Sequence, residues 1–378
     1  MAISTITTSR TYLTKQVTSL SRALQEKTSQ MATGKAGTTY GAVGNNRLMD
    51  LQLTQKVSQI KSYQTSITHA NLHLETLNLT LDRLENIRLE SKAAIDQNDF
   101  QLQTDGQTRS QATAEILLYE AVNILNENVA GHYLYGGSDA VTDPVAAIDD
   151  IMKGTIDRAG LKTVMDEFYQ ANLGPNNNGR MDVSALTTNY TLGVPTDSTF
   201  TIAEDGAHDF GFDIGTVNST LSNVTLTGPG GGDPDTFDIQ FTGQPALGET
   251  IKMEFTLPPA HDEILTLELE ADSDGLQEGT FAIGADLEET ATNLHAKVTA
   301  FLEEHAQTTL KAASDVWAGD SFFDTYNGQE PMRVDGPPFD TATALIAGGA
   351  TTVNWYTGEN SVTDNPRDDK DTIIDSNL

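Results

Sequence analysis

The chain of 378 residues contains 22 Lys and Arg residues against 54 Asp and Glu residues, a net charge of -32, and no cysteine. The absence of cysteine excludes disulfides, thiolate metal sites and cysteine nucleophiles, and the acidity disfavours binding to nucleic acid. Residues 1–145 carry 12 basic and 14 acidic side chains, whereas residues 146–378 carry 10 and 40. A nearly neutral N-terminal part, able to pack against copies of itself, therefore precedes a strongly acidic, solvated body.

Apolar side chains recur at alternating spacings of three and four residues in the N-terminal part. This spacing predicts helices over about 5–33, 47–96 and 107–130, with a narrow coiled-coil-like seam. A glycine-rich loop is expected over 34–46, and a break over 97–106. The predicted assembly seam consists of Leu13, Val17, Leu20, Leu24, Met31, Leu53, Val57, Ile60, Leu74, Leu77, Leu81 and Leu84.

Two long helices joined by a short break predict an antiparallel pair, and hence a helical rod. Between about 182 and 285, apolar residues alternate with polar ones, which predicts antiparallel strands with one buried face. A helix is expected over about 286–312, and loop with short strands from residue 321 onward. The expected fold class is α+β multidomain, with a long N-terminal antiparallel helical rod and an outer antiparallel β-rich domain plus short helices.

Four regions follow from this reading. Residues 1–46 form an assembly helix and loop, and residues 47–144 form the rod. Residues 145–320 form the outer α+β domain, and residues 321–378 form a return segment. No internal repeat is evident in the sequence.

Candidate chemistry is sparse. His69 and His73 have the i, i+4 spacing of a helical metal pair, but no third ligand is signalled, so two solvated histidines are expected. The acidic run 272–278 is too short for a calcium loop. No nucleophile motif appears, and we expect neither enzymatic activity nor a cofactor. The N-terminus lacks the apolar core of a secretory signal peptide, and no run is long enough to insert into a membrane.

Several segments resemble bacterial flagellins of the alphaproteobacterial, rhizobial type. MATGK (31–35) is similar to the end of the first flagellin helix. NVAGHYLYGG (128–137) resembles the N-x-x-G-R-Y-L-F-x-G element of that family. RAGLKTVMDEFYQANLG (158–174), PMRVDGPPFDTATAL (331–345) and VNWYTGENS (353–361) look like further elements of rhizobial-type flagellins. The family also includes the hook–filament junction protein.

The resemblance implies a structural subunit of the flagellar filament that serves motility, self-assembles through its N-terminal helices and is exported to the extracellular flagellum without a cleaved signal peptide. It implies other flagellin subunits, junction and filament cap proteins and an export chaperone as partners. Family members continue past this chain's last residues into a second long helical segment, which we expect to be lacking here. The alternatives are the junction protein, or a surface protein whose outer domain binds a ligand or is an enzyme.

One helical stretch carries a further expectation. In many flagellins the helix corresponding to about 77–95 bears a surface that contacts other subunits and is read by an innate immune receptor. In this sequence the charged residues of that possible inter-subunit or receptor surface are Arg83, Glu85, Arg88 and Glu90. We expect these charges chiefly to make contacts at spacings of three to five residues within the rod, and contacts between subunits.

Overall fold

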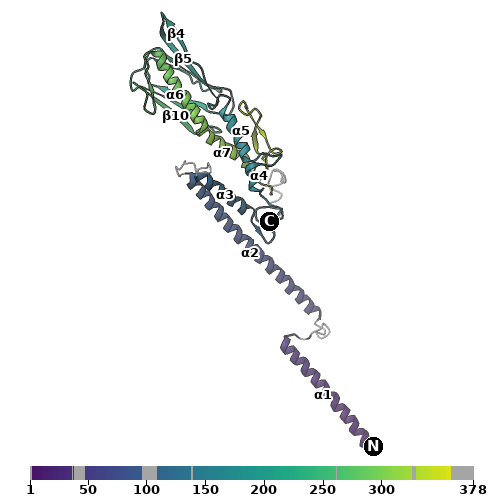
Figure 1. Ribbon diagram of the computed structural model, residues 1–378. Helices are drawn as coiled ribbons and strands as arrows, with labels where there is room; N and C mark the ends of the chain where they lie inside the picture. Colours follow the sequence, from purple (N-terminus) through teal and green to yellow (C-terminus); the bar gives the residue numbers. More distant parts are fainter. Residues whose placement is uncertain are drawn as a thin grey trace. The chain divides into compact units, whose positions relative to one another are not determined.

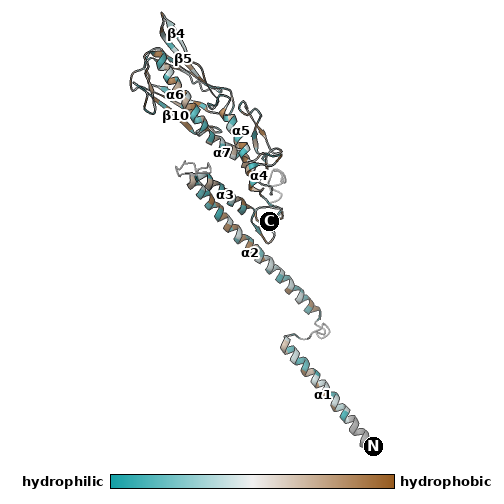
Figure 2. Cartoon of the chain, viewed as in Figure 1, coloured by the Kyte–Doolittle hydropathy of each residue, from teal (hydrophilic) through white to brown (hydrophobic). Residues whose placement is uncertain are grey.

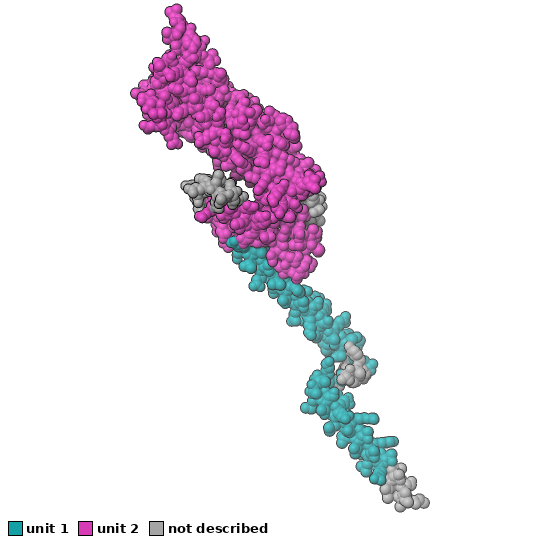
Figure 3. Space-filling model, in the orientation of Figure 1, with its two compact units in different colours: residues 1–83 teal, residues 84–378 magenta. Residues whose placement is uncertain are grey.

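The computed structural model describes residues 2–35, 37, 47–95, 109–137, 139–260, 262–325 and 329–358. Figure 1 labels the main helices and strands. The chain divides into two compact units, unit 1 over residues 1–83 and unit 2 over residues 84–378 (Figure 3). Most of the expected 34–46 loop, the expected 97–106 break and the segment beyond residue 358 lie outside the described residues.

Unit 1 contains α1 (Ala2–Thr33) and most of α2 (Arg47–Ile95). Both helices are rich in Thr, Ser and Gln, and many of these hydroxyls donate to the carbonyl four residues earlier, as Thr14 does to Arg10 and Thr68 does to Gln64. Such bonds satisfy the hydroxyl within the helix, so the polar faces need no tertiary partner. α1 ends beside Gly34, whose φ of +65° is the left-handed conformation common after a helix end.

The predicted fold class is wrong in its central element, because the described residues do not form a long antiparallel rod. Its second member, α3 (Arg109–Leu125), has 17 residues against 49 in α2. At ~1.5 Å per residue, α3 spans about 26 Å of a helix about 74 Å long, so it cannot pair along the length of α2. The part of the chain that the structure describes is instead a mixed α+β fold with four sheets.

A short pair of strands connects α3 to the rest of unit 2. The strands β1 (Asn128–Val129) and β2 (His132–Tyr133) form a small hairpin. They are followed by α4 (Ile148–Lys153) and α5 (Leu161–Leu173). The apolar positions of α5 recur every three or four residues, and Val164, Phe168 and Ala171 are fully buried. This spacing places them on one face, which packs into the core.

The larger sheet has the strand order β3-β5-β8-β7, with β4 pairing to β5 outside that order, and all its pairs are antiparallel. Its strands are β3 (Met181–Val183), β4 (Thr187–Thr191), β5 (Val194–Glu204), β7 (Val224–Thr227) and β8 (Thr236–Phe241). In β8 the alternating residues Phe237, Ile239 and Phe241 are buried, as expected for a strand with one face on the core.

The second sheet has the order β11-β10-β9-β6 and is mixed rather than wholly antiparallel. Its strands are β6 (Asp213–Ser219), β9 (Thr250–Thr256), β10 (Ile264–Asp272) and β11 (Thr280–Ala282). β11 runs parallel to β10, whereas β10 and β9 pair antiparallel. Ile251, Met253 and Phe255 point from β9 into the core.

The helix expected over 286–312 is two helices, α6 (Leu287–Gln307) and α7 (Thr309–Phe323), divided at Thr308. Asp286 caps α6 by accepting a hydrogen bond from the Glu289 N–H at 2.9 Å. α6 contacts strands of both sheets, and α7 packs on α5. The hairpin of β12 (Met332–Val334) and β13 (Leu345–Ala347) follows.

Two apolar cores organise the body. One lies between the two sheets and α6, where Phe200, Phe255 and Leu294 are buried. The other gathers α5, α7 and the segment after β12, where Phe168 contacts Trp317 edge-on at 5.1 Å between ring centroids. Three segments, 158–174, 331–345 and the described part of 353–361, contribute to this second core.

Candidate assembly surface

The apolar seam of α1 is exposed along its length. Leu13, Val17, Leu20, Leu24 and Met31 have between 57% and 87% of their surface accessible to solvent. Spacings of four, three, four and seven residues keep these side chains on one face of a helix. The structure therefore presents this predicted seam as a continuous apolar stripe that nothing in the described part of the chain covers.

The seam of α2 has a stricter spacing. Leu53, Ile60, Ile67, Leu74 and Leu81 recur every seven residues, and each is between 49% and 59% exposed. Figure 2 shows apolar positions alternating with polar ones along this helix. A seven-residue period drifts around a straight helix by only about 20° per repeat, so the five side chains form one narrow line. We call these five residues, together with Leu13, Val17, Leu20, Leu24 and Met31 of α1, the N-terminal seam.

The remaining predicted seam residues differ in exposure. Val57 is half exposed and lies beside the seven-residue line, whereas Leu77 and Leu84 are only partly accessible. The structure thus places ten of the twelve predicted seam residues on the surface of α1 and α2. It does not bring residues of the α1 seam and the α2 seam together into one described cluster.

The charged residues predicted as a contact surface all lie on α2. Arg88 donates from Nε to Glu85 Oε2 at 2.8 Å and from Nη2 to Glu85 Oε1 at 2.7 Å, which is a bidentate pair at i, i+3. The hydrogen bond and the charge of Arg88 hold the pKa of Glu85 below its usual value. Arg83 and Glu90 also make interactions, so none of the four is a free charge on this helix.

Charge divides sharply between the two units. Unit 1 contains nine Lys and Arg residues against four Asp and Glu residues, a net charge of +5, so unit 2 carries -37 of the total of -32. A small net charge spread over 83 residues repels a second copy weakly, and salt screens it within about 10 Å. Association is therefore electrostatically permitted at unit 1 and opposed between the bodies.

Sequence reasoning missed two buried polar clusters in unit 2. In the first, Arg180 donates from Nε to Asp205 and from Nη1 to the carbonyls of Asp340 and Ala342, at 2.9 and 3.1 Å. His208 also contacts the carboxylate of Asp205, with Nε2 at hydrogen-bond distance, 2.8 Å, from Oδ1. These residues stand in GRMD and EDGAHD, which look like ordinary turns, so no sequence signal marks them.

In the second cluster, Arg333 on β12 pairs with Glu167 on α5 and donates from Nη1 to Thr351 Oγ1 at 3.0 Å. Both clusters join segments far apart in the sequence. Arginine suits this task because its planar group presents several donors in fixed directions. We interpret the two clusters as structural: each connects distant segments of unit 2, and we call them the polar ties of that unit.

The described residues provide neither a metal centre nor a membrane-spanning helix. They contain no group of three His, Asp or Glu side chains arranged to hold a metal ion. No helix among them is both long and apolar enough to span a bilayer. Comparisons with family models, with curated proteins and with solved structures gave no match to this chain.

Proposed function

We propose that this chain is a structural subunit of the bacterial flagellar filament and that copies associate through the N-terminal seam. The observation that carries this proposal is the exposed line of five large apolar side chains at seven-residue spacing on α2. Single exposed apolar residues are ordinary on a protein surface, whereas a regular line of them is a surface for another helix.

A second copy is the partner that charge favours. The seam lies in the unit with a net charge of +5, whereas the body of every copy is strongly acidic. Copies packed through unit 1 keep their acidic bodies solvated, which maintains solubility while the seam is buried. The sequence resemblance to flagellins supports the same assignment, and it supplies the filament and motility as the biological setting.

Burial of the N-terminal seam releases enough free energy to drive association of copies. The seam residues are between 49% and 87% exposed, so full burial of each contributes about 1–2 kcal/mol from the area removed from water. Ten exposed positions on α1 and α2 then contribute on the order of 10 kcal/mol per copy before the entropic cost of association. This range accommodates a reversible polymer whose assembly depends on protein concentration.

The first test is sedimentation of the full chain over a range of concentrations, with electron microscopy of the pellet. The variant Ile60→Asp/Ile67→Asp places two carboxylates in the α2 seam. We expect it to raise the concentration required for assembly at least tenfold, because each substitution removes apolar burial and desolvates a charge. The matched control is Ser58→Asp/Thr65→Asp, which adds the same two charges at the same spacing on the opposite face of α2 and leaves assembly unchanged.

The second test is biological. Deletion of the gene in its bacterium removes flagellar filaments from electron micrographs and abolishes swimming, and the seam variant fails to restore either. A chain that stays monomeric at all concentrations, together with a deletion strain that swims normally, contradicts the proposed function.

A further inference from the structure

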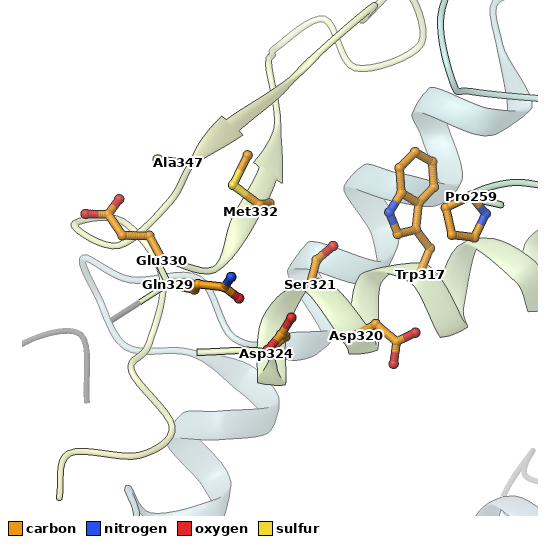
Figure 4. A pocket seen from close by; sticks show the side chains of 9 residues that line it. All are labelled: Pro259, Trp317, Asp320, Ser321, Asp324, Gln329, Glu330, Met332 and Ala347. Atoms are coloured by element: carbon orange, nitrogen blue, oxygen red, sulfur yellow. The ribbon is translucent and has the colours of Figure 1, made fainter. Parts of the chain in front are cut away.

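Two adjoining cavities lie along one face of α7 in unit 2. Their volumes are about 410 and 550 Å³, and they share Pro259 and Asp320, so together they form one groove. Figure 4 shows the part of the groove between Trp317 and Met332. We call it the α7 groove, and its apolar lining includes Pro258, Pro259, Ala313, Val316, Trp317 and Met332.

The groove is elongated along the helix. α7 contributes Thr309, Ala312, Val316 and Asp320, which recur every three or four residues, and its C-cap residue Asp324 continues the same stripe. Fifteen residues at ~1.5 Å each span about 22 Å, the length of four helical turns. Val316, in the middle of the stripe, is 64% exposed although it is a large apolar side chain.

The rim of the groove is acidic. Asp262, Glu263, Asp320, Asp324 and Glu330 are exposed there, and the residues that line the two cavities include no Lys or Arg. None of these five carboxylates forms a salt bridge with another residue of the described chain. An apolar floor surrounded by five negative charges that no described residue pairs with in a salt bridge is complementary to a ligand that is both apolar and cationic.

We propose that the α7 groove docks a basic amphipathic helix of a separate protein. The helix lays its apolar side chains on Val316 and Pro259, and its Lys or Arg side chains meet the carboxylates of the rim. Helix-in-groove recognition uses apolar anchors at i, i+3/i+4 and i+7, which match a groove of four turns. A second copy supplies a basic amphipathic helix in α1, but that helix is engaged elsewhere if the function proposed above holds, since one face cannot pack in two places.

The test uses fluorescence anisotropy of the full chain with a labelled 18-residue probe peptide that has Leu at helical i, i+3/i+4 spacing and Lys at the other positions. We expect saturable binding, no binding of the same peptide with Glu in place of Lys, and protection of residues 309–323 from hydrogen exchange on binding. The variant Asp320→Asn/Asp324→Asn raises the dissociation constant of the probe peptide about tenfold, and Val316→Asp raises it at least as much.

The matched control is Glu303→Gln/Glu304→Gln, which removes two exposed carboxylates from the neighbouring helix α6 and changes the net charge equally. We expect this variant to bind the probe peptide with a dissociation constant within about twofold of that of the parent chain. Equal weakening by the two charge pairs, or no saturable binding, overturns the proposal, because attraction to the net charge alone then accounts for the result. Tighter binding of a peptide of residues 9–33 than of the probe, abolished by Val316→Asp, makes a second copy the occupant and also overturns it. Sedimentation of the same variants tests assembly separately.

Discussion

Arg333 on β12 and Glu167 on α5 form a buried ion pair across 166 positions of the chain. Arg333 Nε donates to Glu167 Oε2 at 3.0 Å, and its Nη2 donates to the other carboxylate oxygen. Because Glu167 is only 4% exposed and Arg333 19%, each charge depends on the other for compensation. The pair ties the segment after residue 330 to the second core.

Removal of one partner of this pair should destabilise unit 2. We expect Arg333→Met to lower the free energy of unfolding by about 3 kcal/mol, because Glu167 is left as an uncompensated buried charge. The double variant Arg333→Met/Glu167→Met should recover part of this loss. Urea denaturation followed by circular dichroism measures both. The exposed pair Lys153–Asp149 is the control, where Lys153→Met should change the stability far less than Arg333→Met does, because solvent screens an exposed ion pair.

A second prediction concerns the shape of the Arg180 side chain. We expect Arg180→Lys to lower the free energy of unfolding by about 2–3 kcal/mol, because an ammonium cannot bind Asp205 and the carbonyls of Asp340 and Ala342 together. Thermal unfolding of the full chain is the measurement. Arg158→Lys, at an exposed position, is the control and should have no effect. Equal stability of the two variants would show that charge alone matters at residue 180.

The same cluster predicts a dependence of stability on pH. Burial acts to raise the pKa of Asp205, but the hydrogen bonds from His208 and Arg180 outweigh it and hold that pKa below its usual value. The unfolded chain therefore takes up this proton at higher pH than the folded chain does. The stabilisation by ionised Asp205 is complete above the unfolded pKa and is lost as pH falls through the folded pKa.

We accordingly expect unfolding free energies measured from pH 7 to pH 2 to fall less steeply below about pH 5 in Asp205→Asn than in the parent chain. The variant should also be less stable at pH 7, because the acceptor of two side chains is weakened. Asp157→Asn, at an exposed position, provides the comparison and should follow the parent curve. A variant curve parallel to the parent curve over the acid range would contradict the assignment.

Amide hydrogen exchange should distinguish α1 from the body before assembly. From residue 9 onward α1 is exposed on nearly every side chain, so its helix has no tertiary burial to stabilise it. We expect rapid exchange over 9–33 and slow exchange over β9 in dilute protein. Under assembly conditions, protection should appear over 9–33. Strong protection there in a verified monomer would show that α1 is stable without a partner.

The sequence predicted those elements whose apolar spacing reports directly on burial. The alternating runs around Ile239, Met253 and Leu267 form β8, β9 and β10, because a strand with one buried face requires that alternation. The three-and-four spacing identified helices in the first 95 residues for the same reason. Spacing reports which face is apolar but not what covers it, and the predicted rod was wrong for that reason.

Other features had no local signal. The division between α6 and α7 at Thr308 interrupts a spacing that runs on from Val298 through Leu302 to Leu310, all of them fully buried. The polar ties depend on partners up to 166 residues away, which neither composition nor periodicity can identify. The α7 groove likewise arises only when α7 meets the loop after β9, since its residues are unremarkable in sequence order.

The ties made by Arg180 and Arg333 bind carbonyl oxygens of the segment between residues 340 and 351 as well as carboxylates. A carbonyl oxygen is present whatever the side chain is, so Thr341 and Thr343, which are both exposed, can change without loosening the attachment. The exposed side chains at 341 and 343 can therefore diversify in sequence while the backbone path of this segment is retained, whereas an insertion between the two carbonyls that Arg180 binds would disrupt the attachment.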